Sequence, residues 1–356
     1  MSENRKSPVF QNFNRLMAGG FDHTDYTRMV NRVGRGEDHV QVCEELGDKS
    51  YAYAEEELQK GHQETAKIFF IKAAADYRIA EYDIVEISDE RLRIYGKLLD
   101  SHARGLQLYD NFTAEKVEIP YKNSKMSGWM LIPRQAAPDV PVIVAIGGLT
   151  GFKEEVHTVA MSLINRGLAV LLIDGPGQGE SLYFNKCYLE IEIEQAYDVI
   201  FDYILSRSDV GNKIGIFGAS FGGYFVPRIA GFLSHKLAGC VSRGGSYEPK
   251  EMVGKYPHSL EKLAIRFGTT EKYVTENLLD KMTLQGIAEK ITCPLLIIHN
   301  EQDPLFNVAG VKRTYAEAAA TDKTIKLYPG VDHCVTLDDT EVHRYFVDWF
   351  ADRLLA

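Results

Sequence analysis

Apolar residues in the first part of the chain recur at the spacing of an α-helix. The run from His62 to Tyr82 shows this spacing most plainly, at Ile68, Phe69, Ile71, Ala74, Ala75 and Ile79. Ser88-Asp89-Glu90 is a helix N-cap signal, and the apolar positions after it are Leu92, Ile94, Tyr95, Leu98 and Leu99. Because no clear second copy of this paired-helix pattern follows at a fixed period, residues 1–111 are predicted to form an all-helical N-terminal domain packed on the next domain, not a solenoid.

The pattern changes at Phe112, where short strand-like runs begin to alternate with helical ones. Val117, Ile119 and Tyr121 alternate with polar positions, and a second apolar run ends at Pro133, which predicts an antiparallel strand pair. Further strands are predicted at residues 141–146, 169–174, 213–217, 238–241, 294–299 and 324–328, with helices at 154–166, 191–206, 222–233, 308–320 and 341–354. This order predicts an α/β domain over residues 112–356, with a mainly parallel sheet covered by helices on both faces.

Residues from about 249 to 291 interrupt the alternation with helical, mixed-charge sequence. An insertion at this place is expected to lie over the carboxyl ends of the strands, where open α/β sheets bind their ligands.

The composition is that of an ordinary soluble protein, with 25% charged and 45% hydrophobic residues in 356. A net charge of -10 gives no reason to expect nucleic acid or an anionic membrane as a partner. The polar start, Met1 to Lys6, is not followed by the apolar run of a secretory signal, and no apolar stretch is long enough to span a membrane. We therefore expect a cytoplasmic protein.

Five cysteines are scattered without CxxC spacing, at Cys43, Cys187, Cys240, Cys293 and Cys334. This pattern favours reduced thiols over a disulfide framework or a structural zinc site. Cys334 directly follows a histidine, but it lacks the turn that would expose a nucleophile, and we interpret it as a packing residue. No cluster of metal ligands stands out, and neither a metal nor a cofactor is predicted.

The sharpest chemical signal is Gly218-Ala219-Ser220-Phe221-Gly222, which lies between an apolar strand run and a helical pattern. A tight strand-to-helix turn of this kind needs small residues two positions before and two positions after the serine, because the backbone is strained and its neighbours lie close. The turn exposes the hydroxyl at a helix N-terminus, where partial positive charge favours an oxyanion. Ser220 is therefore the predicted nucleophile.

A serine nucleophile needs a histidine base that is oriented by a carboxylate. Asp303 and His333 each follow a predicted strand, in the chain order Ser, Asp, His. Glu301 is a rival for the acid, but Asp303-Pro304 marks the turn itself, so Asp303 is preferred. The other nine histidines lack such a context and are interpreted as structural or solvent-exposed.

Two backbone N–H groups are needed to bind the developing oxyanion. Phe221, directly after the nucleophile, is predicted to supply one, and Leu149 or Gly148 in the glycine-rich segment 147–151 is predicted to supply the other. The segment from Asp174 to Gly179 is a weak match to a dinucleotide-binding loop. Since no helix is expected directly after it, we interpret it as a loop that shapes the pocket wall.

These motifs together resemble a branch of the α/β-hydrolases that includes 2,6-dihydroxypseudooxynicotine hydrolase and the polyketide chain-shortening hydrolases of pigment and anthraquinone pathways. The resemblance covers nearly the whole chain. It rests on the helical N-terminal region, on Gly147-Gly148-Leu149 with Lys153-Glu154-Glu155, on the segment from Asp174 to Ser181, and on Ser220-Phe221-Gly222-Gly223-Tyr224 with Pro227-Arg228. It implies the α/β-hydrolase fold with a helical N-terminal cap, an active site between the two, and commonly a homodimer.

The resemblance also implies cleavage of a carbon–carbon bond beside a ketone, in a β-diketone, a polyketide or an aryl ketone. It implies one further acidic group that positions the substrate, for which Glu248 and Glu251 are the candidates. A carboxylesterase or lactonase with the same triad is the main alternative. A binding or regulatory protein on a hydrolase scaffold is a third hypothesis, from a different class.

Overall fold

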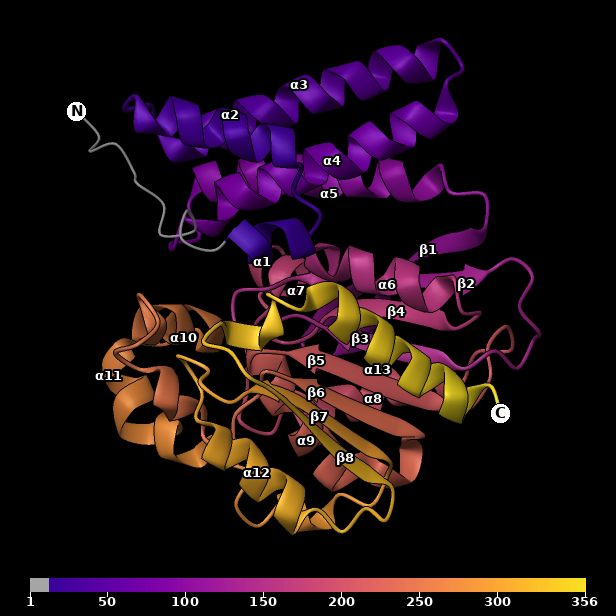
Figure 1. Ribbon diagram of the computed structural model, residues 1–356, viewed down its shortest axis with the longest axis vertical. Coiled ribbons are helices and arrows are strands. Elements are labelled where there is room, and N and C mark those ends of the chain that lie inside the picture. Colours follow the sequence, from indigo (N-terminus) through magenta and orange to yellow (C-terminus); the bar gives the residue numbers. More distant parts are fainter. Residues whose placement is uncertain (1–12) are drawn as a thin grey trace. The chain divides into compact units, whose positions relative to one another are not determined.

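Figure 1 shows the computed structural model of the chain, which describes residues 13–356. The chain forms two compact units, Met1–Ala114 and Glu115–Ala356.

From Phe13 to Gln107 the first unit is helical, as predicted, and strand β1 (Phe112–Tyr121) begins at its end. Its helices are α1 (Phe13–Ala18), α2 (His23–Gly34), α3 (His39–Gln59), α4 (Gln63–Tyr82) and α5 (Asp89–Gln107). The hydroxyl of Ser88 accepts a hydrogen bond from the Arg91 N–H at 3.3 Å, so the predicted N-cap is confirmed. The helices predicted from residue 62 and from residue 88 are therefore α4 and α5.

A buried polar cluster lies inside this helical unit. Asp76 is fully buried, and its carboxylate accepts a hydrogen bond from the Ser50 hydroxyl at 3.0 Å. Lys72 contributes an ammonium 3.5 Å from Asp76, and the same ammonium pairs with Asp25. Burial raises the pKa of Asp76 to about 7, although Lys72 opposes this shift.

The second unit is built on an eight-stranded sheet with the order β1-β2-β4-β3-β5-β6-β7-β8. Its strands are β1 (Phe112–Tyr121), β2 (Ser124–Pro133), β3 (Val142–Ile146), β4 (Ala169–Asp174), β5 (Ile214–Ala219), β6 (Gly239–Arg243), β7 (Leu295–Asn300) and β8 (Lys323–Tyr328). Strand β2 runs antiparallel to β4, whereas the pairs from β4 through β8 are parallel. The prediction of a mostly parallel sheet is thus confirmed.

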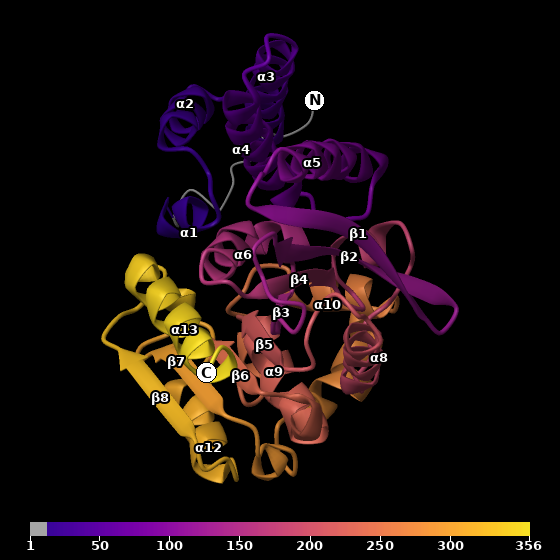
Figure 2. The ribbon, with the colours of Figure 1, turned by 90° about the vertical axis from the view of Figure 1, so that its right-hand side faces the viewer.

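Helices cover both faces of this sheet. Figure 2 shows α6 (His157–Ile164) and α13 (Asp339–Leu354) on one face, and α8 (Glu194–Leu205) and α9 (Phe221–Leu233) on the other. The remaining helices of the alternation are α7 (Gly179–Tyr183) and α12 (Val308–Glu317). Because helices lie on both faces, every residue of β3, β4, β6 and β7 is buried.

The predicted insertion lies between β6 and β7 and is formed of short helices. They include a 3₁₀ turn at Pro249–Met252, α10 (Ser259–Phe267) and α11 (Glu271–Tyr273). Within residues 13–356, the structure contains no helix that is both long and apolar enough to cross a membrane.

Candidate active site

Ser220 lies at the sharp turn between β5 and α9, in a backbone conformation with φ 59° and ψ −121°. A side chain at either flanking glycine would collide with backbone. A Cβ on Gly218 would lie 2.4 Å from the Gly222 carbonyl oxygen, and one on Gly222 would lie 2.5 Å from the Gly147 carbonyl oxygen. The two glycines therefore permit a strained serine, which costs on the order of 1–3 kcal/mol and holds the hydroxyl above the sheet edge.

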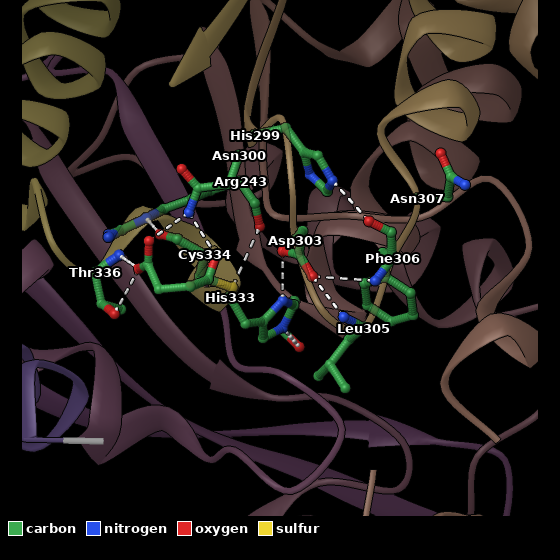
Figure 3. A network of polar contacts seen from close by, with 12 residues as sticks. Arg243, His299, Asn300, Asp303, Leu305, Phe306, Asn307, His333, Cys334 and Thr336 are labelled. Atoms are coloured by element: carbon green, nitrogen blue, oxygen red, sulfur yellow. Dashed lines mark hydrogen bonds and ion pairs between the residues drawn. The ribbon is translucent and has the colours of Figure 1, made fainter. Parts of the chain in front are cut away.

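Asp303 lies in the turn after β7, and its carboxylate is engaged on both oxygens. Oδ1 accepts the N–H groups of Leu305 at 2.8 Å and Phe306 at 3.0 Å, while Oδ2 faces the His333 Nδ1 at 2.8 Å (Figure 3). Burial raises the pKa of Asp303, but the hydrogen bond to His333 and the charge of that ring lower it by more, so the net pKa falls. Glu301, the rival acid, is exposed.

His333 links the acid to the serine. Its Nε2 lies 2.7 Å from the Ser220 Oγ, and its Nδ1 is the atom that faces Asp303. The Phe306 ring meets the imidazole edge-on, at 5.5 Å between ring centroids. Burial lowers the pKa of His333, while Cys334 and Asp303 raise it, and the net pKa is raised. The structure thus brings all three residues predicted from the sequence into one hydrogen-bonded chain.

The loop that carries His333 is held by Asn300, the last residue of β7. The Asn300 amide donates to the Asp332 Oδ1 at 2.6 Å and also to the Asp332 carbonyl. The other carboxylate oxygen of Asp332 accepts the Thr336 hydroxyl at 2.8 Å. Asp332, directly before His333, is thus bonded both to the end of β7 and to Thr336, three residues after His333.

The glycine-rich segment after β3 lies directly against the nucleophile. A Cβ on Gly148 would lie 3.3 Å from the Ser220 Cβ and 3.6 Å from its Oγ, so the backbone of Gly148 lies next to the hydroxyl. Phe221 is the first residue of α9, where N–H groups have no acceptor within the helix. The predicted oxyanion donors therefore come from two segments that meet at Ser220.

Two side chains that the sequence did not single out hold the carbonyls of the glycine-rich segment. The Gln178 amide donates to the Gly147 carbonyl at 2.9 Å and to the Gly148 carbonyl at 3.0 Å. Arg266, from α10 in the insertion, is buried and donates to the Leu149 carbonyl. These bonds set the direction of the successive peptide groups, because a peptide N–H points opposite to its carbonyl.

The expectation that no helix opens directly after the segment from Asp174 to Gly179 is wrong. Helix α7 begins at Gly179 itself, although it has only 5 residues. Its first turn is anchored by Asp174, whose Oδ2 accepts the Glu180 N–H at 2.9 Å. The sequence pattern missed this helix because its N-terminal carboxylate comes from the end of a strand and not from the adjacent cap position.

A fully buried lysine joins this segment to the glycine-rich one. The Lys153 ammonium lies 2.9 Å from a carboxylate oxygen of each of Asp174, Glu180 and Glu154. Burial raises the pKa of Glu154 to about 7, even with Lys153 beside it. The only sequence signal for this cluster was that its members belong to the motifs on which the family resemblance rests.

The two candidate acids of the insertion are placed differently. Glu248 is partly exposed and lies 3.6 Å from the Lys250 ammonium. Glu251 accepts the Asn307 N–H at 2.7 Å and lies 3.3 Å from the Ser246 hydroxyl. The structure thus brings Glu251 to the segment just after the Asp303 turn, whereas Glu248 pairs with a neighbouring lysine.

No cluster of three or more histidine, cysteine or acidic side chains in residues 13–356 has an arrangement that could hold a metal ion. All five cysteines are free thiols.

Comparison with solved structures identifies the architecture. The crystal structure of 2,6-dihydroxy-pseudo-oxynicotine hydrolase is similar with a TM-score of 0.86 at 21% identity, over 96% of both chains. The chain has the α/β-hydrolase fold. Residues 261–340, which include Asp303 and His333, match the family described as serine aminopeptidase, S33.

Sequence comparison also finds relatives of this chain. The hydrolyase poxO of Penicillium oxalicum is 30% identical over 218 residues, which cover 58% of this chain and 51% of the relative. The 2,6-dihydropseudooxynicotine hydrolase of Paenarthrobacter nicotinovorans is 24% identical over 97% of this chain and 92% of its own length. The chain thus spans about half the length of poxO and nearly all of the bacterial enzyme.

Proposed function

We propose that the protein is a serine hydrolase in which Ser220 attacks a carbonyl carbon. The observation that carries this proposal is the chain of hydrogen bonds at 2.7 Å from Ser220 to His333 and 2.8 Å from His333 to Asp303. His333 takes the serine proton as a general base and later returns it to the leaving group as a general acid. Asp303 holds the imidazole with Nδ1 protonated and stabilises the imidazolium.

The tetrahedral oxyanion would be bound by the N–H of Phe221 together with that of Leu149 or Gly148. The partial positive charge at the start of α9 favours the same position. The contacts of Gln178 and Arg266 with the carbonyls of the glycine-rich segment support this assignment, because they hold its peptide groups in fixed orientations.

The bond cleaved is proposed to be a carbon–carbon bond beside a ketone, in a β-diketone, a polyketide or an aryl ketone. Collapse of the oxyanion would expel a carbanion, which a second carbonyl or an electron-rich ring stabilises, and the proton on His333 would go to that carbon. Water would then hydrolyse the acyl-serine. The similarity to a 2,6-dihydropseudooxynicotine hydrolase over nearly the whole chain supports this substrate class.

A carboxylesterase or lactonase with the same triad is the second candidate. One observation favours it: the contacts of Glu251 go to Ser246 and Asn307, and Glu248 pairs with Lys250. In this arrangement neither carboxylate contacts a triad side chain. An ester can be cleaved by the triad and the oxyanion donors alone, without a further acidic group that positions the substrate.

The proposal is tested first by labelling with a fluorophosphonate, which reacts with an activated serine. We expect labelling of the wild type and none of Ser220→Ala; a folded wild-type protein that is not labelled would favour the binding-protein hypothesis. The substrate class is then tested with aryl esters and with 1,3-diketones, using wild type, Glu248→Gln and Glu251→Gln. Ester turnover without diketone cleavage would favour the second candidate over the first.

A further inference from the structure

The two residues after His333 both have backbone conformations that side chains disfavour. Cys334 has φ 66° and Val335 has φ 56°, in the left-handed region that glycine normally occupies. For Val335 this is a marked outlier, because its side chain is β-branched. Such a turn persists only where the surrounding structure holds it, and it directly follows the proposed base.

Arg243, at the end of β6, holds this turn. Its Nε donates to the Cys334 carbonyl at 2.7 Å (Figure 3). Its Nη2 lies 3.3 Å from the Val335 carbonyl oxygen and 2.6 Å from the Asp339 Oδ1. The residue is only 4% exposed, so these groups replace water around the guanidinium. The planar fork of arginine can satisfy two adjacent carbonyls and a carboxylate at once, which an ammonium cannot do in the same geometry.

The backbone of the same residue holds the nucleophile. The Arg243 carbonyl accepts the Ser220 N–H at 2.9 Å, and Arg243 is paired with Ala219 in the register of β5 and β6. One residue thus bonds to the backbone of the serine on one side and to the turn of the histidine on the other.

We propose that Arg243 is a positioning residue that sets the distance between the Ser220 hydroxyl and the His333 imidazole. This inference rests on the proposed function, because it concerns the reactivity of the same serine. It predicts that loss of the guanidinium relaxes the Cys334–Val335 turn and withdraws His333 from the serine, while Ser220 stays in place through its backbone bond.

The test compares Arg243→Met with Arg91→Met. Arg91 is a matched control in the helical unit: it is 2% exposed and likewise donates to a carboxylate, Glu81 at 2.6 Å, and to a carbonyl, Val85 at 2.7 Å. We expect the maximal rate of fluorophosphonate labelling to fall by roughly 10- to 100-fold in Arg243→Met, with the half-saturating concentration unchanged. Arg91→Met is expected to lose thermal stability but to label at the wild-type rate.

Chemical rescue distinguishes a positioning role of Arg243 from a general loss of stability in the variant. Guanidinium ion at tens of millimolar is expected to restore part of the labelling rate of Arg243→Met, and Arg243→Lys is expected to react at an intermediate rate. Two results would overturn the inference. One is a wild-type labelling rate in Arg243→Met. The other is a loss of labelling rate in Arg243→Met that guanidinium does not reverse and that Arg91→Met also shows. If Arg243→Met does not fold, the rate of Arg243→Lys relative to wild type decides. An unlabelled wild type would instead refute the proposed function.

Discussion

The reactivity proposed for Ser220 depends on the protonation state of His333, because only the neutral imidazole can accept the serine proton. Asp303 serves two purposes in this respect. It orients the ring through the 2.8 Å bond to Nδ1, and its charge raises the pKa of His333. Because Asp303 stabilises the charged imidazolium, a higher pH is needed before the ring is neutral and can act as the base.

The first prediction concerns the pH dependence of this step. Because the His333 pKa is raised, labelling of Ser220 is expected to decline as the pH falls through a value above 6.5, the ordinary pKa of histidine. Asp303→Asn is expected to lower the rate on the order of 10³- to 10⁴-fold. It is also expected to move this decline to lower pH, since the carboxylate no longer favours the charged ring. A pH–rate profile of both proteins measures this, and a decline that stays at the same pH would contradict it.

Gln178 affects the proposed oxyanion donors by holding the backbone carbonyls of Gly147 and Gly148. Gln178→Glu keeps the size of the side chain but replaces the donating amide with a carboxylate that repels the carbonyls of Gly147 and Gly148. We expect a roughly 10- to 100-fold loss of kcat with little change in KM, since the loop would turn away from the serine. Steady-state kinetics on an aryl ester tests this, and the exposed Gln195→Glu serves as the control. Equal kinetics in the two variants would rule out the role given to Gln178.

At the scale of elements, the site depends on how loops are joined at the carboxyl edge of the sheet. Lys153 follows the glycine-rich segment, Asp174 ends β4 and Glu180 is the second residue of α7, so one buried cation connects three parts of the chain. Buried charges of this kind are held at a desolvation cost, and removal of one partner leaves the others unpaired.

Lys153→Met is therefore expected to destabilise the protein by about 3–5 kcal/mol. Lys116→Met is the matched control, because Lys116 pairs with the same Glu180 at 2.6 Å but its side chain is 41% exposed. The control is expected to cost about 0–1 kcal/mol, since solvent screens an exposed pair. Thermal and denaturant unfolding measure the stability of both variants. Similar losses of stability in the two would show that burial of the Lys153 cluster does not determine its contribution.

At the scale of the whole molecule, the helical unit carries its own pH dependence. The pKa of Asp76 is about 7 in the folded unit against 3.8 for an unperturbed side chain, so the folded state keeps a proton that the unfolded state releases. Stability is therefore expected to fall as the pH rises from about 4 to about 7 and to level off above that.

Asp76→Asn removes this titration while its amide oxygen can still accept the Ser50 hydroxyl. We expect its melting temperature to exceed that of wild type above about pH 7, with the difference shrinking as the pH falls toward about 4. Asp48→Asn, at an exposed aspartate of the same unit, is the control and should show no such trend. A constant difference across the pH range would exclude Asp76 as the cause.

Much of the second unit was readable from the sequence because its interior strands are short, continuous apolar runs. The order Ser220, Asp303, His333 was equally readable, since each residue ends or follows a strand and parallel strands place such ends at one edge. The homodimer, the cytoplasmic location and the ketone or ester substrate stay predictions.

The contacts of Arg243, Gln178 and Arg266 could not be predicted in the same way. Their partners are backbone carbonyls of loops far away in the chain, and a carbonyl has no sequence signature. The choice between Glu248 and Glu251 was open for a related reason: both are acids in one short turn, and only tertiary packing distinguishes their surroundings.

The insertion between β6 and β7 bonds to both halves of the proposed machinery. Arg266 binds the glycine-rich segment, and Glu251 binds the Asn307 N–H beside the acid turn. Exchange of residues 249–291 for those of another hydrolase would thus not be a neutral swap of specificity. A graft that kept positions 251 and 266 would change which molecules enter, whereas one that replaced them would also change how fast any molecule reacts. In this chain, the segment expected to select the substrate also carries contacts on which the reaction rate is expected to depend.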